Sequence, residues 1–280
     1  EDLLVKSQLA SYETYQHDLI TVGVDIYNVE FEALGGEVVF PDNEELPSAK
    51  GILIEDENDL NSLSIPDPEN DGRMPLFINA AERIYKNIGK EVNVSCAVVG
   101  PFTLAAIMCG FEQFIYKLIL KPDFCIELMN FAKEVSLTYA TALVDRGVGI
   151  AINESWISPP LLSPDLYKKY VYPVEKEMID KLKKTGVKNI ALISGGDTTP
   201  IAEYMIKTGS SLLIADPETD QEYYKQLCAE NDIILRANMS SGLVENGSEQ
   251  EIKEEVKRIL QLRGSYPGFI FGCGVVSYST

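Results

Sequence analysis

Short apolar runs recur along the chain, and each ends in small or polar residues. The runs occupy residues 19–24, 92–99, 148–152, 190–193, 211–215, 233–237 and 269–271. Runs of this length, rich in Val, Ile and Leu and without polar alternation, are typical of strands buried on both faces of a parallel sheet. The pattern therefore predicts seven buried strands.

Helix-compatible segments separate most of these runs, and two of them carry clear end signals. Ser163 and Pro164 form an N-cap and first turn, and Gly186 ends the same segment. Ser248 and Glu251 have the spacing of a capping box ahead of an amphipathic stretch. Strands separated by helices are parallel, so the sequence predicts an α/β fold.

The number and rhythm of the strands favour a TIM (β/α)8 barrel in one domain spanning residues 1–280. An eighth strand comes either from residues 38–40 or from sequence upstream of Glu1, and we expect the final helix to be missing. An open doubly wound sheet is the alternative, but no GxGxxG loop follows the first run. We expect the acidic segment 41–71 to be a loop at the rim, or a lid.

Charge and cysteine content narrow the class of protein. The net charge of -19 disfavours nucleic acid and anionic membranes as partners. Five cysteines without CxxC spacing indicate a reducing, cytoplasmic setting. No apolar run reaches the roughly 20 residues of a membrane helix. The sequence leaves the oligomeric state open.

A barrel would gather the residues that follow its strands at one face, where such proteins hold their active sites. These residues are Asp25, Tyr27, Gly100, Asn153, Glu154, Ser194, Asp197, Asp216, Asn238 and Cys273. The set offers carboxylates, amides and one thiol but no histidine, because His17 precedes the first strand.

Three of these residues are candidates for catalysis, and each has a structural alternative. Asp25 is either catalytic or a cap for the next turn. Glu154, between Asn153 and Trp156, is a candidate proton donor or metal ligand if it is desolvated. Cys273, between two glycines, is either a thiolate ligand or nucleophile, or a small core residue.

The other polar residues at the strand ends are candidates for binding a small-molecule substrate. They are Tyr27, Asn153, Ser194, Asp197 and Asn238. Asp216 and Asn238 have the alternative of holding loops in place.

Several separated motifs together resemble one known family. They are VGVDIYNVEFEALGGEVVF (22–40), GPFTLAAIMCG (100–110), NESWISPPLLSPDLYKKYVYP (153–173), GGDTTPI (195–201), NMSSGLVENGS (238–248) and GFIFGCGV (268–275). They resemble the uroporphyrinogen decarboxylase superfamily, and more closely its methylcobamide:coenzyme M methyltransferase-like branch. The resemblance implies a TIM barrel, and it places Asp25 where the family has its pyrrole-binding aspartate.

This chain departs from both branches of the family. It lacks the arginine-containing N-terminal segment with which the decarboxylases grip substrate carboxylates. The zinc-dependent methyltransferases bind metal through a His-x-Cys pair and a distant Cys. Cys273 matches the distant Cys, whereas Ile193 and Gly195 occupy the places of the pair. A zinc site in this chain would need other ligands, such as Glu154 with Asp197 or Asp216.

The resemblance implies a corrinoid-linked methyltransferase-like enzyme. Its methyl group would move between a methylcobamide, carried by a separate corrinoid protein, and a small substrate near Glu154 and Cys273, with zinc as an open question. Two alternatives are a cofactor-free decarboxylase of uroporphyrinogen or a similar polycarboxylate, and a non-catalytic barrel that binds a corrinoid or a partner protein.

Overall fold

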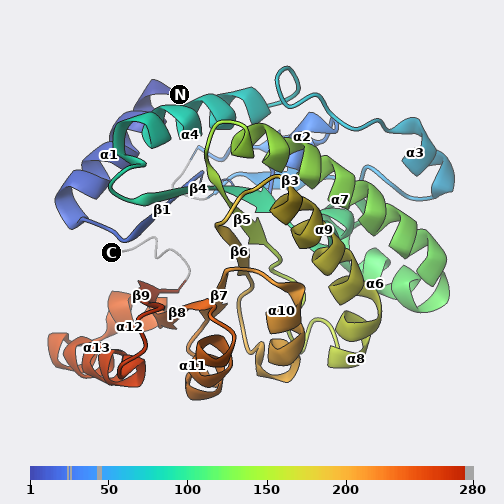
Figure 1. Cartoon of the computed structure of the whole chain (residues 1–280). Coiled ribbons are helices and arrows are strands. Elements are labelled where there is room, and N and C mark those ends of the chain that lie inside the picture. The colour runs from blue at the N-terminus through green and yellow to red at the C-terminus, as the bar shows by residue number, and fades with distance from the viewer. Residues whose placement is uncertain (24, 26, 43–45, 275–280) are drawn as a thin grey trace. The chain divides into compact units, whose positions relative to one another are not determined.

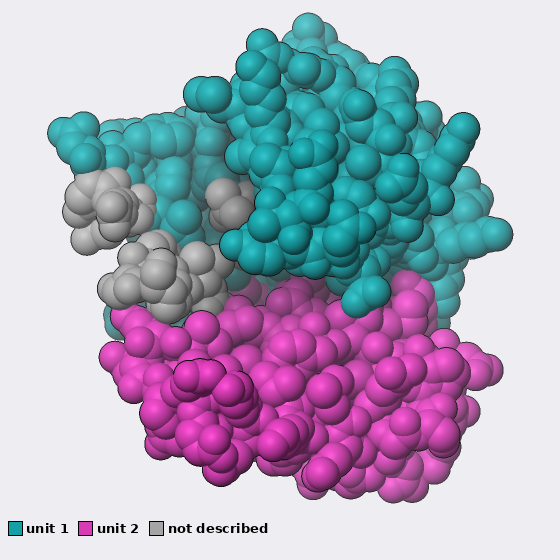
Figure 2. All heavy atoms as spheres, turned by 90° about the vertical axis from the view of Figure 1, so that its left-hand side faces the viewer, with its two compact units in different colours: residues 1–154, 173–190 teal, residues 155–172, 191–280 magenta. Residues whose placement is uncertain are grey.

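The computed structural model describes residues 1–23, 25, 27–42 and 46–274, and their contacts divide into two compact units. Unit 1 comprises residues 1–154 and 173–190, and unit 2 comprises residues 155–172 and 191–280 (Figure 2). Each unit has its own strands and its own covering helices (Figure 1).

Unit 1 is built around three parallel strands with helices packed against them. Its elements are α1 (Asp2–Tyr15), β1 (Leu19–Val22), α2 (Val29–Ala33), β2 (Glu37–Val39), β3 (Ser48–Lys50), α3 (Glu57–Ser62), α4 (Met74–Ile88), β4 (Asn93–Val99), α5 (Pro101–Cys109), α6 (Phe111–Leu120), α7 (Pro122–Val144), β5 (Gly149–Asn153) and α9 (Tyr172–Lys184, from Pro173 onward).

The strands β1, β4 and β5 pair in parallel, in that order. Val22 lies opposite Cys96, and Val99 lies opposite Asn153, so β4 and β5 reach their carboxyl ends together. The buried faces of β4 and β5 are almost wholly apolar, as expected for parallel strands covered on both sides.

The segment around β2 differs from the sequence-based expectation. Residues 38–40 do not supply a further barrel strand, because β2 pairs with β3 in a separate antiparallel ladder, with Glu37 opposite Lys50. The stretch 41–71 is also more ordered than a loop, since it contains β3 and α3. Asp56 caps α3 with its side chain and completes a capping box with Asp59. Val24, at the end of the first apolar run, lies outside the described residues.

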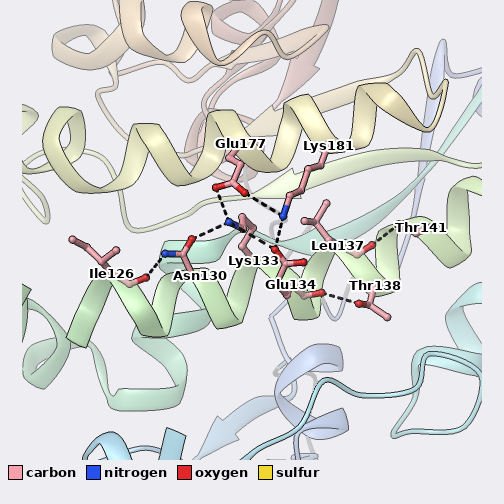
Figure 3. A network of polar contacts seen from close by, with 9 residues as sticks. All are labelled: Ile126, Asn130, Lys133, Glu134, Leu137, Thr138, Thr141, Glu177 and Lys181. Carbon is pink, nitrogen blue, oxygen red and sulfur yellow. Dashed lines mark hydrogen bonds and ion pairs between the residues drawn. The ribbon is translucent and has the colours of Figure 1, made fainter. Parts of the chain in front are cut away.

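A buried lysine joins two helices of unit 1 (Figure 3). Lys133 on α7 is 3% exposed, and its Nζ contacts Glu177 Oε2 on α9 at 2.7 Å and donates to Asn130 Oδ1 at 2.8 Å. Lys181 on α9 completes the network through Glu134 at 2.6 Å. The ammonium group is thus surrounded by acceptors, which a buried charge requires.

Unit 2 repeats the strand–helix alternation three times and adds a fourth strand. Its elements are α8 (Pro164–Leu166), the π-helical turn η1 (Tyr167–Val171), β6 (Ile190–Ile193, from Ala191 onward), the 3₁₀ turn η2 (Thr199–Ile201), α10 (Ala202–Thr208), β7 (Leu212–Ala215), α11 (Gln221–Glu230), β8 (Ile234–Met239), α12 (Ser241–Asn246), α13 (Glu249–Arg263) and β9 (Phe269–Cys273).

The strands β6, β7, β8 and β9 are parallel and neighbour one another in chain order. Helices α10, α11 and α13 lie along one side of these strands (Figure 1). The predicted helix signals are confirmed: Ser163 accepts a hydrogen bond from Leu166 N, and Ser248 and Glu251 form the capping box of α13. With β1, β4 and β5, the described residues contain seven parallel strands.

No single helix among the described residues is long and apolar enough to cross a membrane. The pair α5 and α6 meets that test only when the two helices are taken together, and it bends by 105°. Every residue of α5 is buried in unit 1, as in the core helix of a folded domain.

Candidate functional site

Glu154, the residue after β5, lies at the N-terminus of α5 in unit 1. Its Oε1 accepts from Phe102 N at 2.9 Å, and its Oε2 accepts from Thr103 N at 2.9 Å and from Thr103 Oγ1 at 2.7 Å. The N-terminal N–H groups of a helix have no partner within the helix, and they favour a negative charge. The geometry therefore gives Glu154 a positioning role at α5, and its catalytic role stays a prediction.

The environment of Glu154 affects its protonation. The side chain is fully buried, and this burial raises its pKa to about 7 although the three hydrogen bonds oppose the rise. A carboxyl group with such a pKa exchanges its proton near neutral pH, as a general acid or base must. Gly100 is part of the same arrangement, because a Cβ at this position would overlap the Glu154 carboxyl group.

A second buried carboxyl group lies at the end of the neighbouring strand. Glu30 on α2 is 1% exposed, and its Oε1 accepts from Val99 N at 2.7 Å. Burial raises the pKa of Glu30 to about 7, and the hydrogen bond from Val99 opposes this change. The backbone at the carboxyl end of β4 and at the start of α5 thus donates to two carboxyl groups, those of Glu30 and Glu154, whose pKa values are both raised to about 7.

Asp25 is buried and paired within unit 1. Its Oδ2 forms an ion pair with Arg73 Nη1, and its Oδ1 accepts from Asn28 Nδ2. Arg73 also binds Glu32 Oε2 at 2.5 Å and lies over the ring of Phe40, 4.8 Å from the centroid. Both oxygens of Asp25 therefore have partners from its own chain.

Asn153 and Tyr27 differ in exposure. Asn153 is buried, and its Nδ2 donates to Ala151 O at 3.1 Å, which holds the amide against its own strand. Tyr27 is partly exposed in the turn that precedes α2. A substrate-binding role for either residue stays a prediction.

In unit 2, the carboxyl ends of β7, β8 and β9 share a chain of hydrogen bonds that we call the unit 2 array, formed by Asp216, Asn238 and Arg236. Asn238 Nδ2 donates to Asp216 Oδ1 at 2.8 Å, and Arg236 Nε donates to Asn238 Oδ1 at 3.0 Å. Arg236 Nη2 donates to the carbonyl oxygen of Cys273 at 2.8 Å. Gly272 makes this approach possible, since a Cβ there would overlap Asn238 Oδ1 and Arg236 Nε.

The loop after β6 contributes small residues next to the unit 2 array. A Cβ on Gly195 would lie 3.3 Å from Asp216 Oδ2, so the glycine leaves this oxygen uncovered on that side. Ser194 is 2% exposed, and its Oγ has no hydrogen-bond partner among the described residues. Asp197 is exposed and accepts from Thr199 N at 3.0 Å, as a turn residue does.

Cys273 lies at the end of β9 and is partly buried, whereas the other four cysteines are buried. It packs against an apolar cluster that includes Met239, Ile259 and Leu262, between β8 and α13. This contact agrees with the packing alternative for Cys273 and does not test its proposed reactivity.

The donor set does not fit a catalytic zinc ion. Within the described ranges, no three His, Cys, Asp or Glu side chains are placed to share a metal ion. Zinc needs about three protein ligands of this kind. We therefore assign no chemical step of this protein to a metal ion.

Sequence reasoning missed Arg73, Glu30 and Arg236. The two-residue spacing of Arg236 and Asn238 is a usable signal, because alternate residues of a strand face the same side. Arg73 offers no such signal, since it lies 48 residues from its partner Asp25.

Comparison with known proteins connects this geometry to a family. The family model for uroporphyrinogen decarboxylase (URO-D) matches residues 1–278. The chain is 26% identical to the methylcobamide:CoM methyltransferase MtbA of Methanosarcina acetivorans, over 96% of this chain and 77% of that protein. It is 24% identical to the uroporphyrinogen decarboxylase of Geobacter sulfurreducens, over 90% of this chain and 76% of that protein.

A solved structure agrees with the fold. A methyltransferase from Methanosarcina mazei superimposes with a TM-score of 0.88 at 24% sequence identity, covering 100% of this chain and 81% of that one. The predicted fold class is thereby confirmed as α/β, with seven parallel strands of an incomplete TIM-type barrel. Because the family model covers nearly the whole sequence, this chain belongs to the uroporphyrinogen decarboxylase (URO-D) family.

Proposed function

We propose that this protein is a corrinoid-linked methyltransferase that moves a methyl group between a cobamide on a separate corrinoid protein and a small substrate. The observation that carries the proposal is the unit 2 array, in which Asp216, Asn238 and Arg236 form a compact polar site at the strand ends. The similarity to methylcobamide:CoM methyltransferases over nearly the full chain supports the same reaction class.

A methylcobamide supplies a methyl group that leaves cobalt without the bonding electrons. The accepting atom must therefore offer an electron pair and lose any proton it carries. Asp216 is the carboxylate of the unit 2 array, and its Oδ2 faces the open side of Gly195. We assign the proton to Asp216, with Asn238 holding the carboxylate through Oδ1.

The decarboxylase alternative receives less support from unit 1. A polycarboxylate substrate needs cationic partners, and Asp25 would have to bind pyrrole N–H groups. Arg73 and Asn28 already engage both Asp25 oxygens, and Glu32 also binds Arg73. This pairing occupies both oxygens of Asp25, whereas Arg73 Nη2 has no hydrogen-bond partner among the described residues.

A spectroscopic assay tests the proposal. Methylcobalamin is incubated with the protein and a panel of small thiols, amines and carboxylates, and its visible spectrum is followed. We expect demethylation that depends on the acceptor and falls at least tenfold in Asp216→Asn, as for loss of a general base. Absence of methyl transfer with every acceptor, together with loss of acetate carboxyls from uroporphyrinogen, would replace this proposal with the decarboxylase.

A further inference from the structure

Arg236 carries a positive charge that Asp216 compensates only at a distance, across Asn238. Its Nε and Nη2 donate to the neutral oxygens of Asn238 and Cys273, and no carboxylate of the described residues forms an ion pair with it. The other partly buried arginines differ: Arg73 pairs with Asp25 and Glu32, and Arg146 pairs with Glu69 at 2.7 Å.

Arg236 is also partly buried. Burial lowers its pKa, an effect that the charge of Asp216 opposes. Asn238 lies between the two charges, since its amide group donates to Asp216 and accepts from Arg236. A cation in such surroundings is stabilised by an anion that reaches it, and arginine favours oxyanions with two oxygens.

The guanidinium group is held in one orientation, as recognition of a ligand requires. Two of its nitrogens are fixed by the ends of β8 and β9, and Gly272 keeps the space for them. At the end of β6, which is separated from β8 by β7, Ser194 Oγ is buried with no partner among the described residues, and this leaves a polar group available to a ligand.

We propose that the carboxyl ends of β6 to β9 form a metal-independent binding site for a small carboxylate, with Arg236 as the cation that recognises it. The inference rests on the proposed function in one respect: the bound carboxylate belongs to the substrate that exchanges the methyl group. The site takes the place of the family's metal centre, whose His-x-Cys positions hold Ile193 and Gly195 in this chain.

Calorimetric titration with propionate and with neutral propionamide, each with and without EDTA in the buffer, tests the site without any cobamide. We expect propionate to bind at least tenfold more tightly than propionamide, and Arg236→Gln to weaken propionate binding by about ten- to hundredfold. Arg236→Lys should retain part of the affinity. Arg146→Gln, the matched control with the same loss of charge, should leave binding unchanged.

Three results would overturn the inference: no propionate binding, equal binding by Arg236→Gln, or binding that EDTA abolishes. A second measurement covers the case in which Arg236→Gln does not fold. Arg236→Lys keeps the positive charge but not the two-nitrogen geometry of the guanidinium group, so its affinity for propionate is compared with that of the wild-type protein by the same titration. A several-fold weaker affinity with unchanged propionamide binding supports the site, and an affinity equal to that of the wild type would count against it.

The experiments distinguish a failure of the methyltransferase proposal from a failure of the carboxylate site at Arg236. Propionate binding without methyl transfer would refute the methyltransferase and leave the anion site standing. Methyl transfer that is insensitive to Arg236→Gln would refute the anion site alone.

Discussion

Glu154 and Thr103 form the most extensive polar contact at the strand ends of unit 1, because one carboxylate oxygen accepts from both the backbone N–H and the hydroxyl group of the threonine, at 2.9 and 2.7 Å. The contact ties the end of β5 to the first turn of α5. It depends on close approach, which only the absence of a side chain at Gly100 allows.

Gly100→Ala should therefore destabilise the protein. The added methyl group would overlap the Glu154 carboxyl group and force it away from its three donors. We expect a loss of about 1–3 kcal/mol in the free energy of unfolding, measured with urea. Gly242→Ala on α12 is the control: its Cβ would meet Ser240 Oγ at an ordinary 3.5 Å, so the variant should be neutral or slightly stabilised. Equal effects of the two substitutions would contradict the model of the contact.

Glu30 makes stability depend on pH in an unusual direction. Its folded pKa of about 7 lies above the ordinary value of 4.5, so the folded state binds more protons than the unfolded state between these values. The contribution of Glu30 to stability is complete below about pH 4.5 and is lost as the pH rises to about 7.

Glu30→Gln tests this dependence, because glutamine keeps an acceptor for Val99 N but cannot ionise. Relative to wild type, the variant should become more stable as the pH rises from 4.5 to 8, by as much as about 3 kcal/mol. Urea unfolding at several pH values measures the difference. Glu37→Gln, at an exposed position, should show no such trend, and a flat difference for Glu30→Gln would disprove the assignment.

Lys133 is a buried cation, and its contribution to stability can be tested by removing either its partner or its own charge. Glu177→Ala removes the ion-pair partner at 2.7 Å and leaves Asn130 and the more distant Glu134, at 3.8 Å, so we expect a loss of about 1–2 kcal/mol, reduced because Glu177 is half-exposed. Lys133→Met removes the charge together with its solvation cost and should change stability by less than about 1 kcal/mol.

Thermal unfolding with a surface control distinguishes these outcomes. Glu203→Ala breaks the exposed pair with Lys207 and should change the melting temperature little. A larger loss in Lys133→Met than in Glu177→Ala would show that the ion pairs and hydrogen bonds of the ammonium group stabilise the fold by more than its desolvation costs.

The strands were predictable where polar residues bracket an apolar run. The run 190–193 is bounded by Asn189 and Ser194, and β6 has those same bounds. The helix α3 was missed because its residues are mostly polar and only Leu60 is buried, so its sequence shows no helical spacing of apolar residues. Its capping box uses aspartate at both positions, a weaker signal than Ser with Glu.

The candidate site was predictable in its strand-end residues and not in their partners. Asp25 and Asn238 follow apolar runs and could be named from the sequence, although β8 extends through Asn238 to Met239. Their arginine partners arise in different ways: Arg236 belongs to the same strand as Asn238, whereas Arg73 reaches Asp25 through the tertiary fold. Pairings of the second kind leave no trace in local sequence patterns.

Removal of metal ions should leave the stability and the activity of this protein unchanged. By the resemblance to the zinc-dependent methyltransferases, Ile193 and Gly195 are expected at the places of the His-x-Cys pair, and the described residues gather no three-ligand cluster. Dialysis against a chelator should therefore change neither the melting temperature nor the rate of methyl transfer. The double variant Ile193→His with Gly195→Cys restores two ligands of the pair and should retain more zinc than wild type, as measured by elemental analysis. Stoichiometric zinc in the wild-type protein, lost in Cys273→Ser, would instead show that this chain builds a metal site from other ligands.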